Sequence, residues 1–162
     1  MKRFLLVLML IMPLAPNPGV ADDNGGELFA MGAEAFDGGD YLEALLIWHE
    51  ASQLGNTDAM TSLADMLYRG IGVPIEIDTA IWWYHLAARL GDPVAQLTLG
   101  EFSFQGIGGE TDPVKAYIWI GLAAEQGNEW AIQQRHYYAR GLDSKALRVA
   151  EQLIDQRVFP KR

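Results

Sequence analysis

A block of 36 residues occurs twice in succession, and this internal repeat limits the possible folds more than any other feature of the sequence. When residues 58–93 are aligned with residues 94–129 without a gap, eleven positions are identical, whereas composition alone predicts about two or three. The stretch WWYHLAARLG (82–91), for example, corresponds to IWIGLAAEQG (118–127). Such a repeat predicts stacked copies of one small unit, each burying its apolar face against the next.

The first half of each copy predicts a short helix. Ala59, Leu63 and Leu67 recur at every fourth position, which places an apolar stripe along one side of a helix. Gly70 follows this stripe, and glycine can end a helix because it adopts positive φ at little cost. In the second copy, the loop after the corresponding helix has the sequence GIGG in place of GIGV.

The second half of each copy predicts another helix, with a large tryptophan among small residues. Trp83 precedes Ala87 and Ala88, and small residues allow a neighbouring helix to approach closely. We therefore expect Trp83 and its equivalent, Trp119, to fill the space between successive helix pairs as core residues. Asp112 followed by a proline is typical of an N-cap and the first helical position.

The same pattern continues more weakly on both sides of the two clear copies. Residues 27–57 form a looser copy whose loop between the helices is four residues shorter, and Asp40 with Glu43 matches a capping box. A last amphipathic helix, with Asp143 as its N-cap, predicts a polar end for the stack. We expect a single domain over residues 22–162, with repeats at about 27–57, 58–93 and 94–129 and a cap at 130–162.

Residues 1–21 have the composition of a secretory signal peptide. Lys2 and Arg3 precede an apolar run that ends at Leu14, and Ala21 closes a segment of small residues suited to cleavage. The run is too short to span a bilayer, which needs roughly 20 residues, so we expect no stable membrane insertion after cleavage. Since the chain contains no cysteine, it cannot be a lipid-anchored lipoprotein. The predicted location is periplasmic or secreted.

Charge and residue types argue against several function classes. After cleavage, 21 acidic and 10 basic residues remain, a formal charge of −11, which disfavours nucleic-acid binding. No serine lies in a Gly-x-Ser-x-Gly turn, and the glycine loops lack the Lys and Ser or Thr of a phosphate-binding loop. His49 and His85 are one period apart, which places them roughly 10 Å apart, too far to share a zinc ion easily. We therefore predict no catalytic residue, no cofactor and no metal site.

The repeat resembles the Sel1-like repeat family, whose units are tetratricopeptide-like helix pairs of about 36 residues. The resemblance covers nearly all of residues 22–162 and rests on the Gly-x-Gly loops, the Ala-x-x-Trp helices and the closing Ala-Ala-x-x-Gly of both clear copies. It implies an all-α fold, a right-handed solenoid of antiparallel helix pairs with a C-terminal capping helix. It also implies adaptor or regulatory binding of proteins and no catalytic residue. The aromatic that the family pattern places at Leu67 and Ser103 is missing, and an aromatic follows one position later in both units.

The displaced aromatics define the candidate binding site. Aligning the first helix of each repeat places Phe36, Tyr68 and Phe104 at one equivalent position, and Asp65 and Glu101 at another. By the geometry that the resemblance implies, both positions face a concave groove. An aromatic row edged by carboxylates would suit a protein segment with apolar and basic side chains. Alternatively, the three aromatics pack between repeats in place of the missing family aromatic.

Two functional hypotheses follow from the sequence. The first is a non-catalytic protein–protein interaction module of the bacterial cell envelope, a monomer that binds a segment of an envelope or periplasmic protein in its groove. The second is an enzyme or binder acting on peptidoglycan or another glycan. The second hypothesis would be favoured if Trp82 and Tyr84 lay on the surface together with a pair of carboxylates some 5–9 Å apart in a cleft.

Overall fold

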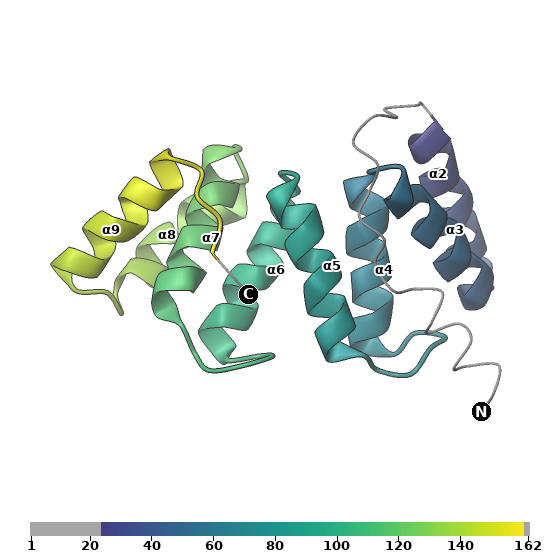
Figure 1. The fold of residues 1–162 in the computed structure, drawn as a ribbon, viewed down its shortest axis with the longest axis horizontal. Coiled ribbons are helices and arrows are strands. Elements are labelled where there is room, and N and C mark those ends of the chain that lie inside the picture. The colour runs from purple at the N-terminus through teal and green to yellow at the C-terminus, as the bar shows by residue number, and fades with distance from the viewer. Residues whose placement is uncertain (1–23, 161–162) are drawn as a thin grey trace. The chain divides into compact units, whose positions relative to one another are not determined.

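A computed structural model of the protein describes residues 24–160 and contains α-helices and no strand within this range (Figure 1). The predicted signal peptide, residues 1–21, lies outside the described residues. No helix of the described part is long and apolar enough to cross a membrane. The helices are α2 (Asn24–Asp37), α3 (Tyr41–Gln53), α4 (Thr57–Arg69), α5 (Ile77–Arg89), α6 (Pro93–Gln105), α7 (Pro113–Glu125), α8 (Glu129–Ala139) and α9 (Ser144–Asp155). The predicted all-α class of successive helix pairs is confirmed.

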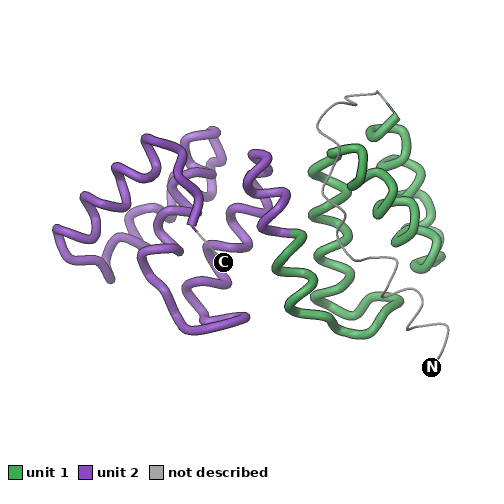
Figure 2. Tube along the Cα trace, viewed as in Figure 1, with its two compact units in different colours: residues 1–83 green, residues 84–162 purple. Residues whose placement is uncertain are grey.

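The chain divides into two compact units, residues 1–83 and residues 84–162, with the boundary inside α5 (Figure 2). Short connections join the consecutive helices that pack together within each unit, and these pairs run antiparallel: α2 with α3, α3 with α4, α6 with α7, and α7 with α8. Three residues join α2 to α3, whereas seven join α4 to α5. This difference of four residues agrees with the shorter loop predicted for the first repeat.

In the first unit, α3 packs against both α2 and α4. Trp48 of α3 is buried, and its indole Nε1 donates a hydrogen bond of 3.1 Å to the carbonyl oxygen of Phe29 in α2. Gly32 lies directly on this indole, because a Cβ added there would come within 2.5 Å of two atoms of the ring. Trp83, at the end of the unit, is 0% exposed, as predicted.

In the second unit, α7 is the central helix and packs against α6, α8 and α9. Its nine consecutive residues from Ala116 to Ala124 are all buried, which explains why this segment is almost entirely apolar in the sequence. Trp119 is 1% exposed, so the core role predicted for it is also confirmed. Gly121 allows α9 to approach, since a Cβ there would lie 2.3 Å from the side chain of Ile154.

Most helix ends follow the predicted local rules. Gly70 and Gly106 take left-handed conformations, with φ of 70° and 78°, at the C-caps of α4 and α6. Asp112 and Asp143 accept hydrogen bonds from backbone amides in the first turns of α7 and α9. The capping box predicted at Asp40 is wrong: Asp40 is the N-cap residue of α3, but its side chain makes no capping hydrogen bond because its backbone is not in the extended conformation of the other caps.

Candidate protein-binding site

Three of the five predicted site residues lie in the first unit. Phe36 is half-buried, and its ring packs against Tyr41 and Trp48, with centroid separations of 5.2 and 5.4 Å. Asp65 and Tyr68, both in α4, are also half-buried. The carboxylate of Asp65 accepts a hydrogen bond of 2.7 Å from Nε of Arg69 one turn later. Phe36 therefore serves the contact between α2 and α3 while part of its ring remains accessible.

The other two predicted residues, Glu101 and Phe104, lie on α6 in the second unit. Phe104 is 39% exposed, and its ring contacts Tyr137 and Tyr138 of α8 at centroid distances of 5.7 and 5.2 Å. Burial, and then the nearby negative charge of Glu101, raise the pKa of Tyr138. Phe104 thus belongs to an aromatic cluster between α6 and α8 that remains open to solvent on one side and has a carboxylate beside it.

Tyr137 and Tyr138 were not predicted as site residues. Tyr138 lies one 36-residue period after Phe102, and both are buried, so the repeat alone could have indicated a packing role for Tyr138. Tyr137 is 49% exposed and lies one period after Glu101, so the repeat could also have indicated that it belongs beside the candidate site. The two tyrosine rings contact each other at 5.5 Å.

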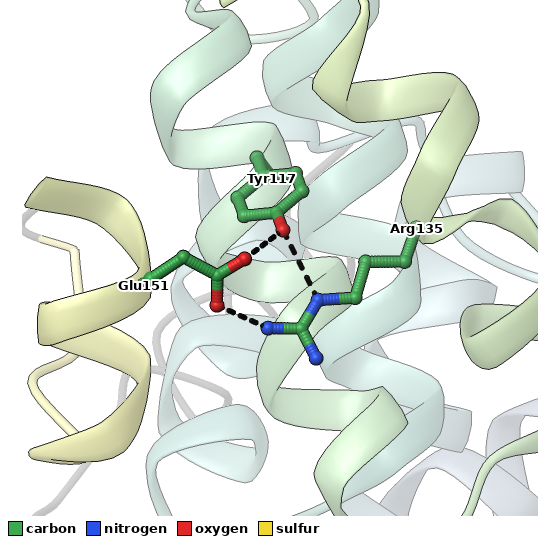
Figure 3. A network of polar contacts seen from close by, with 3 residues as sticks. All are labelled: Tyr117, Arg135 and Glu151. Carbon is green, nitrogen blue, oxygen red and sulfur yellow. Dashed lines mark hydrogen bonds and ion pairs between the residues drawn. The ribbon is translucent and has the colours of Figure 1, made fainter. Parts of the chain in front are cut away.

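A second polar arrangement joins three helices of the second unit (Figure 3). Arg135 of α8 pairs with Glu151 of α9, and its Nε donates a hydrogen bond of 3.1 Å to the hydroxyl of Tyr117 in α7. The Tyr117 hydroxyl donates in turn to the other oxygen of Glu151. Burial and the hydrogen bond to Glu151 raise the pKa of Tyr117. Each of the three side chains bonds to another, so the network is suited to holding α7, α8 and α9 together.

The histidines pack against the repeat tryptophans. The ring of His49 meets Trp83 edge-on at 5.9 Å, and the ring of His85 meets Trp119 at 5.6 Å. Burial lowers the pKa of His49, which keeps its imidazole neutral near pH 7. Among residues 24–160, no group of three or more histidine, cysteine or acidic residues could hold a metal ion.

The arrangement that would favour the glycan hypothesis is not found at Trp82 and Tyr84. Tyr84 is 3% exposed, and its ring packs edge-on against Phe102 at 5.7 Å. Trp82 is half-buried against Trp83, with ring centroids 5.0 Å apart. Tyr84 therefore cannot stack on a sugar ring at the surface, and the observation that would have favoured a glycan-binding surface is lacking.

Solved structures provide two comparisons. The crystal structure of a Sel1 repeat protein from Oxalobacter formigenes has a TM-score of 0.62 and 27% identity, covering 84% of this chain and 98% of that protein. A protective antigen present in uropathogenic Escherichia coli strains, which displays an SLR fold, has a TM-score of 0.75 and 24% identity over 96% of this chain. The chain spans only 37% of that antigen's length, and this second likeness concerns the fold alone.

Sequence comparison identifies the repeat itself. No curated protein matched the chain significantly. The family profile described as Sel1 repeat matches residues 57–92 and 93–128, one residue before the units predicted at 58–93 and 94–129. Residues 57–92 and 93–128 are therefore each similar to a Sel1 repeat.

Proposed function

We propose that the protein is a non-catalytic interaction module of the bacterial cell envelope, exported by residues 1–21, that binds a segment of a periplasmic or envelope protein. Sel1-like repeat proteins are generally protein-interaction modules, which supports the class of function. The proposed site consists of Phe36, Asp65, Tyr68, Glu101 and Phe104. Its ligand is a basic, partly apolar protein segment.

The observation that carries this proposal is the accessibility of the aromatic at Phe104. A ring that served only the core would be buried as fully as Phe102, two residues earlier on the same helix, which is 7% exposed. Phe104 instead keeps 39% of its surface accessible beside the exposed Tyr137. Partly exposed aromatic rings next to a carboxylate are typical of protein-binding hot spots, because they offer a large apolar contact with little loss of side-chain entropy.

A capture experiment from envelope extract tests the proposal. The purified protein should retain a partner, and Tyr68→Ala or Phe104→Ala should each weaken capture by about 1–2 kcal/mol while the melting temperature stays nearly unchanged. Phe102→Ala is the matched control for Phe104→Ala, since removing a buried ring should lower the melting temperature. Charge reversal at Asp65 and Glu101 should slow association and reduce its salt dependence.

The opposite result would place these aromatics in the core. If Tyr68→Ala and Phe104→Ala lower the melting temperature as much as Phe102→Ala does, the rings hold repeats together. If Asp65→Lys also leaves capture unchanged, the binding surface lies elsewhere on the protein.

A further inference from the structure

The acidic charge of the protein is concentrated in its first unit. Residues 24–83 contain ten aspartates and glutamates and a single cationic residue, Arg69, whereas residues 84–162 contain nine acidic and nine basic residues. Arg69 is already engaged by Asp65 at 2.7 Å. The first unit therefore has no further lysine or arginine among residues 24–83 to neutralise its other carboxylates.

An exposed apolar surface lies within this acidic unit, at the start of α3. Tyr41, Leu42 and Leu46 are 39%, 50% and 43% exposed, and together they line a shallow open hollow; we call these three residues the α3 patch. The rim of the hollow includes Asp40, Glu43 and the loop residue Gly72. Large apolar side chains gathered at one exposed place mark a surface for binding rather than ordinary scattered exposure.

The α3 patch is held in place by its surroundings. The backbone at Gly72, with φ of 72°, lies so close to Tyr41 that a Cβ added at position 72 would come within 2.4 Å of the Tyr41 Cβ. On its other side, the ring of Tyr41 packs against Phe36 at 5.2 Å. A surface whose central ring is fixed before binding loses less conformational entropy when a partner docks.

The two carboxylates beside the α3 patch, Asp40 and Glu43, have no partner within the described part of the molecule. The N-caps of α4, α6, α7, α8 and α9 all bond to backbone amides through their side chains, but the N-cap Asp40 does not. Within residues 24–160, the Asp40 and Glu43 side chains make no hydrogen bond or ion pair. Both are exposed, so they are available to a cationic group next to the apolar hollow.

We propose that the α3 patch docks a basic amphipathic segment of a partner protein, with an apolar side chain in the hollow and lysine or arginine groups on Asp40 and Glu43. The apolar contact supplies most of the affinity, and the carboxylates select for cationic partners and speed association. A divalent cation is not the natural ligand, since no cluster of three or more potential ligands exists among residues 24–160. This surface goes beyond the five-residue site and does not depend on it.

A synthetic amphipathic helix of leucine and lysine is a suitable probe, with a leucine–glutamate helix of the same pattern as its control. Binding of the labelled leucine–lysine peptide to the purified protein is followed by fluorescence anisotropy at two salt concentrations. The double variant Leu42→Ser with Leu46→Ser should weaken binding by about tenfold or more, because two accessible apolar contacts are lost. Asp40→Lys with Glu43→Lys should weaken binding and also flatten its salt dependence.

A matched charge control distinguishes binding at the α3 patch from general electrostatic attraction of the peptide to the acidic first unit. Glu34→Lys with Glu50→Lys changes the net charge by the same amount at exposed positions of α2 and α3 that do not line the hollow. This control should weaken peptide binding much less than Asp40→Lys with Glu43→Lys. Circular dichroism melts of all variants check that each remains folded, which is expected because the changed positions are exposed.

Three outcomes would overturn the proposal. The first is no detectable binding of the leucine–lysine peptide to the unmutated protein. The second is equal weakening by the two charge variants or no effect of the leucine variants, which would indicate charge attraction alone. The third is loss of binding only in Tyr68→Ala and Phe104→Ala, which would support the five-residue site while rejecting the α3 patch.

Discussion

The two units are built from the same kind of helix pair, yet their polar side chains make different contacts. In residues 84–160, Tyr117, Arg135 and Glu151 tie three helices together, and the amide of Gln126 donates to the buried Gln96 at 2.8 Å. In residues 24–83, the ion pair between Arg69 and Asp65 lies within a single helix. The comparison indicates that charged side chains of the second unit link separate helices, whereas the ion pair of Arg69 and Asp65 in the first unit links none.

The largest expected effect is the loss of stability when the buried tryptophan that each unit contains is removed. Trp83→Ala and Trp119→Ala should each destabilise the protein by about 3–5 kcal/mol, because both indoles are buried and their removal leaves large cavities. Thermal or denaturant unfolding followed by circular dichroism measures this loss. Trp130→Ala is the control, since Trp130 is 42% exposed and should cost far less. Equal losses for Trp83→Ala and Trp130→Ala would show that the repeat tryptophans are not core residues.

Adding a methyl group at the equivalent glycines Gly32 and Gly100 should destabilise the protein less than removing a tryptophan, and by different amounts in the two units. Gly32→Ala should destabilise the first unit by about 1–3 kcal/mol, because the added methyl group meets the rigid, hydrogen-bonded indole of Trp48 at 2.5 Å. Gly100→Ala should cost less, since its methyl group meets the flexible end of Ile120 at 2.8 Å. Gly26→Ala, with no atom within 4 Å, serves as the helical control. A lower denaturant midpoint for Gly100→Ala than for Gly32→Ala would contradict this packing.

The network of Tyr117, Arg135 and Glu151 predicts that the stability of the second unit depends on pH. Because the pKa of Tyr117 is raised in the folded state, its contribution to stability is complete below the ordinary value of 10 and is lost as the pH rises through the raised pKa. Tyr117→Phe should lose about 1 kcal/mol at pH 7 and show a shallower decline above pH 10. Unfolding free energies measured from pH 7 to pH 11 check both expectations. Parallel curves for the two proteins would show that Tyr117 does not stabilise the fold through its hydroxyl proton.

The smallest effect concerns the ion pair of the first unit. Arg69→Ala should change the unfolding free energy by less than about 0.5 kcal/mol, because 64% of the Arg69 side chain and 38% of the Asp65 side chain are exposed and water screens their attraction. Arg135→Ala in the second unit should cost more, since it removes a partner from both Tyr117 and Glu151. Denaturant melts of both variants measure the contrast. If Arg69→Ala were the more damaging change, the first unit would depend on its charges for folding.

The repeat allowed much of the fold to be predicted from the sequence. Period and residue size indicated the burial of Trp83 and Trp119, and local rules indicated the caps at Gly70 and Asp112. The network of Tyr117, Arg135 and Glu151 could not be predicted, because its members follow neither the 36-residue period nor a local motif and meet only when three helices pack.

The candidate site was predictable only in part. The repeat alignment identified the aromatic position of Phe104 and could have added Tyr137, one period after Glu101. The ring contact between Phe104 and Tyr137 was not predictable, because it depends on how α6 and α8 pack. The α3 patch was missed because Asp40 and Glu43 fit a capping box, and the sequence cannot show that Asp40 fails to cap its helix. Placement of both sites on one continuous groove stays a prediction.

Hydrogen–deuterium exchange of the protein, alone and with the partner captured from envelope extract, tests the binding role most directly. We predict that the partner slows exchange in α4 and α6, which carry Tyr68 and Phe104, and leaves the buried helix α7 unchanged. Slowing confined to α5 and α7, with α4 and α6 unaffected, would contradict the proposal that the first helix of each repeat carries the binding surface.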